Sequence, residues 1–289
     1  MADVDLRPMS LGEVLDRTFS LYRSNFWLFV GIMSMPLVVL FAFQVGAVSL
    51  GVGAAFGIGG RNIGPGATAG IVTGIIVGVV VFLVAYLGAY GAAQAATVFA
   101  VSDLYLGRSA TVRGSFGKVR GRILRVLGVL ILTGLIVLVG CLALFVPGMI
   151  LLARTGVSVP VSMLEDESPS AAISRSMELT KGFGWSMFVI FFLVWILQMM
   201  AAALVQYPLM FLTLATAKNH IAPFLLLIVQ YLSSFISSAL IGPIGTIALS
   251  LMYYNLRVRK EAFDLQHLMS SLGPSSGPVT EPPSAPSTA

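Results

Sequence analysis

The chain has 289 residues, of which 57% are apolar and only 10% are charged, and its mean hydropathy is +0.94. A soluble domain carries roughly 25% charged residues, so 17 basic and 12 acidic side chains are too few to cover a water-soluble globule of this size. The apolar runs are continuous over about twenty residues rather than alternating, which favours transmembrane helices over a β-barrel. The net charge of +5 fits basic residues that flank membrane spans, so we do not expect nucleic-acid binding.

Residues 1–25 are predicted to form an amphipathic helix at the membrane interface. Ser10 and Glu13 have the spacing of a capping box, in which each side chain bonds to the backbone N–H of the other residue. From Leu11 to Tyr22, apolar side chains then recur on one face and charged side chains lie mostly opposite. This pattern is typical of a helix that lies on the membrane surface, and the charges of this stretch argue against a signal peptide.

Residues 26–260 are predicted to form a bundle of six transmembrane helices, so the fold class is all-α. The expected spans are 26–52, 68–100, 126–146, 149–164, 185–213 and 223–255. The third span is expected to stop at Pro147-Gly148, and a glycine-rich loop, 57–66, should separate the first two. The fourth is short and contains Arg154 and Pro160, which predicts a tilted or broken helix, with a re-entrant segment as the alternative.

Two further patterns concern packing and the regions outside the spans. Gly70, Gly74 and Gly78 follow at four-residue spacing, which predicts a face on which another helix packs closely. A second amphipathic helix is expected from Ser168 to Lys181. The tail, residues 261–289, consists largely of Ser, Pro, Gly and Thr and is predicted to be disordered.

The distribution of basic residues predicts the orientation. With both termini in the cytoplasm, fourteen basic residues lie on the cytoplasmic side, while the outer loops hold only Arg61 and Lys218. This distribution follows the positive-inside rule. It also favours a fourth segment that crosses, because otherwise the downstream loops would be inverted.

The chain contains a predicted threefold repeat. A shift of 158 residues superposes Arg17 on Arg175, Arg23 on Lys181 and Trp27 on Trp185. A shift of 97 residues matches more loosely, placing Phe116 on Phe19 and Arg120 on Arg23. Each copy consists of a surface helix, a basic-aromatic hinge where that helix passes into the membrane, and a pair of spans.

Several of these motifs resemble a known bacterial family. They are the stretch from Leu6 to Arg17, the stretch Tyr22-Arg23-Ser24-Asn25-Phe26-Trp27, Val146-Pro147-Gly148, Glu165, Ala172 to Ser176, and Leu179-Thr180-Lys181-Gly182. Residues 6–260 are thereby similar to the membrane domain named after glycerophosphoryl diester phosphodiesterase and to related multi-pass proteins of the bacterial inner membrane. In that family the phosphodiesterase chemistry belongs to a separate soluble domain. Only 29 residues follow Lys260, so the resemblance implies a membrane protein without that activity.

No catalytic, cofactor or metal site is expected. His220 and His267 have no ligand-like spacing to carboxylates, and Cys141 is the single cysteine. Polar residues within spans are functional candidates, and the leading ones are Arg154, Gln94, Gln198 and Gln206. Interhelical hydrogen bonds or snorkelling would also explain them.

The hinges are the strongest functional signal. Their candidate residues are Arg17, Arg23, Trp27, Arg175, Lys181 and Trp185. They could hold anionic lipid headgroups, or they could serve only to orient the protein. We therefore expect a non-enzymatic protein of lipid or envelope organisation. The alternatives are a transporter of a small solute or lipid and a structural partner of a membrane complex or homo-oligomer.

Overall fold

The computed structural model describes residues 8–58, 65–216 and 222–261. Their regular secondary structure is entirely helical. The helices are α1 (Leu11–Ser24), α2 (Phe26–Ile58), α3 (Pro65–Tyr105), α4 (Val112–Val119), α5 (Ile123–Ala143), α6 (Phe145–Thr155), α7 (Ser158–Leu164), α8 (Pro169–Leu179), α9 (Gly184–Ala215) and α10 (Ala222–Glu261). The predicted disorder of the tail after residue 261, most of the glycine-rich loop and the short loop at His220 lie outside the described residues.

Among the described residues, six segments are long and apolar enough to cross a membrane, as predicted. They are carried by α2, α3, α5, the α6–α7 segment, α9 and α10. In hydrocarbon each backbone N–H and C=O needs a partner within the segment, and a helix supplies one. The chain is therefore a multi-pass α-helical membrane protein.

The helices form three similar units along the chain. Each unit has a short helix and then an antiparallel pair: α1 before α2 and α3, α4 before α5 and α6, and α8 before α9 and α10. The shifts of 97 and 158 residues carry Phe26, the first residue of α2, onto Ile123 and Gly184, the first residues of α5 and α9. The predicted register of the repeat thus coincides with the helix boundaries.

Helix α1 begins at the predicted capping box. The backbone N–H of Ser10 donates to the Glu13 carboxylate at 2.6 Å, and that of Glu13 donates to the Ser10 hydroxyl at 3.3 Å. Its apolar stripe packs largely on α10 rather than on lipid alone, because Val14 and Thr18 are buried. The Tyr22 hydroxyl donates to the carbonyl of Leu240 in α10 at 2.6 Å, and burial raises the pKa of Tyr22, so the hydroxyl keeps its proton.

The fourth span is broken into α6 and α7. Helix α6 has 11 residues and reaches only about 16 Å, roughly half of the hydrocarbon thickness. It ends at Thr155 because Pro160 lacks an N–H for the carbonyl of Gly156 and its ring would clash with that carbonyl. The predicted break is confirmed, and α7 continues into the protein core with most of its residues buried.

The end of the third span was predicted wrongly. Helix α5 ends at Ala143, the chain turns at the extended residue Leu144, and Pro147 lies in the first turn of α6. Proline fits there because the first N–H groups of a helix have no partner within the helix. The turn is sharp because α6 packs against α5 with Gly148 facing Cys141, where a Cβ on Gly148 would lie 2.2 Å from the sulfur.

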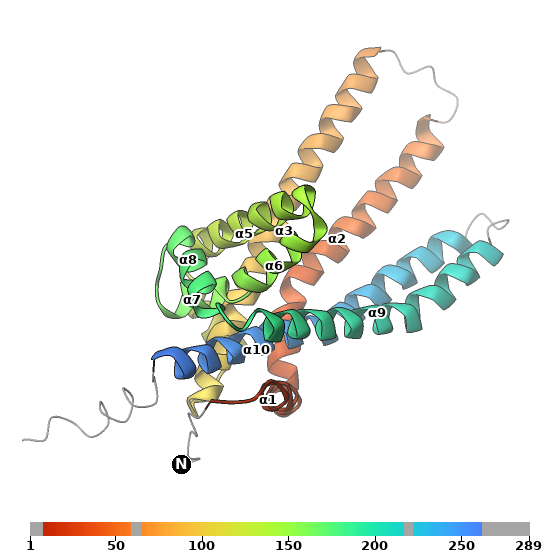
Figure 1. Cartoon of the computed structure of the whole chain (residues 1–289). Coiled ribbons are helices and arrows are strands. Elements are labelled where there is room, and N and C mark those ends of the chain that lie inside the picture. The colour runs from red at the N-terminus through yellow and green to blue at the C-terminus, as the bar shows by residue number, and fades with distance from the viewer. Residues whose placement is uncertain (1–7, 59–64, 217–221, 262–289) are drawn as a thin grey trace, which may run out of the picture.

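The hydrophobic core lies at one end of the bundle, where the three units meet. Small residues of α3 between Gly91 and Ala100 are buried there, and a Cβ on Gly91 would lie 3.0 Å from Val126. The prediction that another helix packs closely at Gly70, Gly74 and Gly78 is not met within the described part of the chain. A Cβ on any of these glycines would meet no described atom within 4 Å. Away from the core the α2–α3 and α9–α10 hairpins diverge (Figure 1).

The tight α5–α6 turn predicts a steric cost at one glycine. We expect Gly148→Ala to lower the free energy of unfolding by about 1–3 kcal/mol, because the new methyl group would overlap the Cys141 sulfur and backbone. Gly134→Ala in α5 is the matched control, since its Cβ meets no described atom within 4 Å. Denaturant titration in detergent micelles measures both, and equal stability of the two variants would contradict the packing.

Candidate functional site

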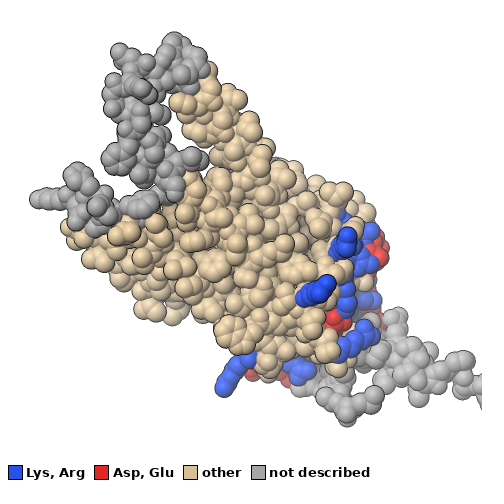
Figure 2. Space-filling view, turned by 180° about the vertical axis from the view of Figure 1, so that it is seen from behind, with Lys and Arg blue, Asp and Glu red and all other residues tan. Residues whose placement is uncertain are grey.

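The charged residues gather at the end of the molecule that holds the core (Figure 2). The first and last described parts of the chain meet there. The backbone N–H of Met9 donates to the Asn255 side chain at 2.8 Å, and the Asn255 amide donates to the Met9 carbonyl at 3.0 Å. Arg259 donates to the same carbonyl at 2.7 Å. Both described ends therefore lie on one side of the membrane region.

The three hinges, residues 23–27, 120–124 and 181–185, present the same pair of side chains. The second residue of each following span is strongly exposed: Trp27 by 81%, Leu124 by 83% and Trp185 by 75%. The basic residue four positions earlier is exposed as well, and these residues are Arg23, Arg120 and Lys181. In a membrane such side chains lie at the headgroup level.

The third hinge was only partly foreseen. The loose match of Arg120 to Arg23 was recognised in the sequence, but Leu124 was not, because leucine lacks the amphipathic ring that marks an interface. Its equivalence to the two tryptophans follows from its position in α5 and its exposure. Arg17 is also exposed, six residues before Arg23 on α1.

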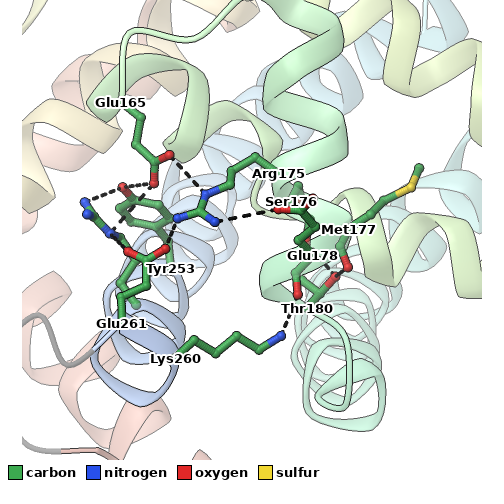
Figure 3. A network of polar contacts seen from close by, with 10 residues as sticks. Glu165, Arg175, Ser176, Met177, Glu178, Thr180, Tyr253, Lys260 and Glu261 are labelled. Carbon is green, nitrogen blue, oxygen red and sulfur yellow. Dashed lines mark hydrogen bonds and ion pairs between the residues drawn. The ribbon is translucent and has the colours of Figure 1, made fainter.

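Arg175 occupies a different environment from the other predicted hinge residues. Its guanidinium bonds to Glu165 at 3.3 Å and forms ion pairs with Glu178 at 3.7 Å and with Glu261 (Figure 3). These carboxylates come from the end of α7, from α8 and from the end of α10. Arg175 therefore joins three elements of the protein and is already neutralised by acidic side chains.

Arg257 and Tyr253 complete this ion-pair network. Arg257 pairs with Glu261 at 2.9 Å and with Glu165 at 3.8 Å. The Tyr253 hydroxyl donates to Glu165 at 2.9 Å and accepts from Arg257 at 3.2 Å (Figure 3). The sequence carried a local signal, because Tyr253, Arg257 and Glu261 follow at i,i+4 spacing, but the partners in α7 and α8 are brought in by folding.

Arg122 and Arg125 hold the second acid of the Glu165–Glu167 stretch. Both guanidinium groups pair with Asp166, Arg122 at 3.1 Å. Asp166 has a positive φ of 62°, a left-handed conformation that Asp adopts more readily than most residues. Neither Glu165 nor Asp166 is thus left to bind a cation. Among the described residues no group of three His, Cys, Asp or Glu side chains could hold a metal ion.

The structure separates the predicted intramembrane polar residues. The Gln206 amide donates to the Ser234 hydroxyl at 2.9 Å, which links α9 to α10. Gln94 is half-buried in α3, and Gln198 is exposed on α9. Arg154 lies at the end of α6 and lines a groove together with Trp185, and none of these glutamines is among the described residues that line it. The geometry does not unite them into one polar path.

No family model, curated protein or solved structure matches this chain.

The ion-pair network predicts a difference between two glutamates. We expect Glu165→Gln to lower the free energy of unfolding by about 1–3 kcal/mol, because it leaves two arginines short of a counter-charge in a site where the Glu165 side chain is only 16% exposed. Glu178→Gln should cost less than about 0.5 kcal/mol, since that side chain is 69% exposed. Denaturant titration in micelles measures both, and similar losses would contradict a central role for Glu165.

Proposed function

We propose that this protein organises anionic lipid around its charged end, without enzymatic activity, through its three hinges. The observation that supports this is the threefold recurrence of one exposed basic side chain followed, four residues later, by one exposed apolar side chain: Arg23 and Trp27, Arg120 and Leu124, Lys181 and Trp185. Such a pair suits the boundary between headgroups and acyl chains.

The hinge cations are electrostatically distinct from the internal arginines. Arg175, Arg257, Arg122 and Arg125 each pair with carboxylates of the protein, so their charge serves the fold. Within the described part of the chain, Arg23, Arg120 and Lys181 form no ion pair. A basic side chain close to an anionic membrane surface contributes about 1 kcal/mol of attraction, so three of them would enrich anionic lipid locally.

We further propose that the charged end faces the cytoplasm of a bacterium, with the spans in the inner membrane. The positive-inside distribution supports this orientation. The motifs around Ser10, Trp27 and Gly182 support kinship with the multi-pass proteins that the chain resembles. The phosphodiesterase activity of that family's soluble domain is not part of the proposal.

The proposed function predicts that lipid enrichment depends on hinge charge. We expect the wild-type protein, extracted from vesicles of phosphatidylethanolamine and phosphatidylglycerol, to retain phosphatidylglycerol preferentially in native mass spectrometry. The double variant Arg23→Gln with Lys181→Gln should lower this preference by about tenfold or more, because two attractive contributions are removed.

The control removes the same charge elsewhere at the same end. Arg108 and Arg113 are exposed but lie outside the hinges, so Arg108→Gln with Arg113→Gln should leave most of the preference intact. Equal losses in the two double variants would indicate a general charge effect, and an unchanged preference in both would contradict lipid binding at the hinges.

The proposed orientation is tested by a single introduced cysteine. In a Cys141→Ser background, Arg108→Cys places a thiol in the exposed connection between α3 and α4. We expect a membrane-impermeant maleimide to label it in inside-out vesicles and not in intact spheroplasts, because the basic end should stay in the cytoplasm. Labelling of intact spheroplasts would reverse the assigned orientation.

A further inference from the structure

A groove of about 530 Å³ lies between α6 and the beginning of α9. Its walls are apolar, with Met149 and Ile150 on one side and Trp185 and Phe188 on the other. Along α6 it extends from Phe145 to Arg154, a rise of about 14 Å. Both helices belong to candidate spans, so the walls of the groove face hydrocarbon rather than water.

Among the described residues that line this groove, Arg154 is the only one that is charged. It is half-buried near the end of α6, and its guanidinium has no ion pair or hydrogen bond with the described residues. A charge within a span is costly unless it finds a partner or reaches the headgroups.

The neighbouring acids do not supply that partner. Glu165 and Glu261 are bound by Arg175 and Arg257, and Asp166 is bound by Arg122 and Arg125. These three acids are thus engaged by other arginines, and Arg154 lines the groove without a carboxylate partner among the described residues.

Helix α8 holds the backbone of Arg154 in place. The Arg154 carbonyl accepts hydrogen bonds from the hydroxyls of Ser176 at 2.9 Å and Thr180 at 3.0 Å. Thr180 immediately precedes the hinge that leads to Trp185, so the same contacts set the level of Arg154 relative to that ring. The cation and the interfacial indole therefore line the same groove.

We propose that this groove binds one anionic phospholipid, with Arg154 as the ligand of the headgroup phosphate and an acyl chain along α6 and α9. The guanidinium fork matches phosphate oxygens in a bidentate manner, and the apolar walls match a hydrocarbon chain. A soluble anion would use the cation but not the apolar walls of the groove, which belong to two candidate membrane spans. This site rests on the proposed function, because it names one specific position at which anionic lipid is held.

Tryptophan fluorescence tests the site directly. The reporter protein keeps Trp185 and carries Trp27→Phe and Trp195→Phe, both at exposed positions. It is reconstituted into phosphatidylcholine vesicles that contain either brominated phosphatidylglycerol or brominated phosphatidylcholine at the same mole fraction. We expect phosphatidylglycerol to quench Trp185 preferentially, and Arg154→Gln to reduce the relative binding constant by about tenfold.

A second reporter separates this site from hinge binding in general. It keeps Trp27 and carries Trp185→Phe and Trp195→Phe. Its preference for phosphatidylglycerol should depend on Arg23 and be unaffected by Arg154→Gln. If Trp27 shows an Arg23-dependent preference while Trp185 is indifferent to Arg154→Gln, the groove site is overturned and the proposed function stands. If Trp185 shows an Arg154-dependent preference for phosphatidylglycerol while Trp27 shows no preference, the groove site stands and the hinge function fails.

A variant that keeps the Arg154 charge and fills the groove tests whether a lost quenching preference is caused by misfolding. Gly184 lines the groove, and a Cβ there meets no described atom within 4 Å, so Gly184→Leu should be accommodated. We expect it to remove the preferential quenching of Trp185 while the unfolding midpoint stays at the wild-type value. Full quenching preference in a stable Gly184→Leu protein would overturn the proposal that a lipid chain occupies the groove.

Discussion

A charge in hydrocarbon is costly unless it is paired or reaches the headgroups, and this constraint organises the whole molecule. The described charges collect at one end, where they can reach water and headgroups (Figure 2). Several of the partly buried charges are paired, above all in the network of Glu165, Arg175, Arg257 and Glu261, whereas Arg154 has no carboxylate partner among the described residues. Because this network joins α7, α8 and α10, the same charged groups also connect α7, which follows the second unit, to the third unit.

The distribution of packing follows from that arrangement. Buried side chains concentrate near the charged end, where small residues of α3 let neighbouring helices approach closely. Farther away the hairpins diverge (Figure 1), and their exposed apolar side chains are suited to contact lipid. Burial therefore holds the units together at one end, while the surface of each hairpin toward the other end is left to lipid.

The hinges and the Arg154 groove are two consequences of the same geometry. Each short helix meets the membrane at the headgroup level and then turns into a span, which leaves a basic and an apolar side chain outside the bundle. In the second unit α6 ends just after Arg154, which lines a groove together with Trp185 of the third hinge. The threefold repeat is thus least regular where the lipid site is proposed.

The sequence by itself determined the helical membrane class, the number of spans, the capping box at Ser10 and the register of the repeat. Each of these depends on local composition or spacing, such as a run of apolar residues long enough to cross a bilayer. Only the tertiary structure decided that α1 packs on α10, that Arg175 faces three carboxylates, and that Arg154 and Trp185 line one groove. These facts join residues far apart in the chain, and a hydrophobic stripe or an arginine looks the same in sequence whether lipid or protein will face it.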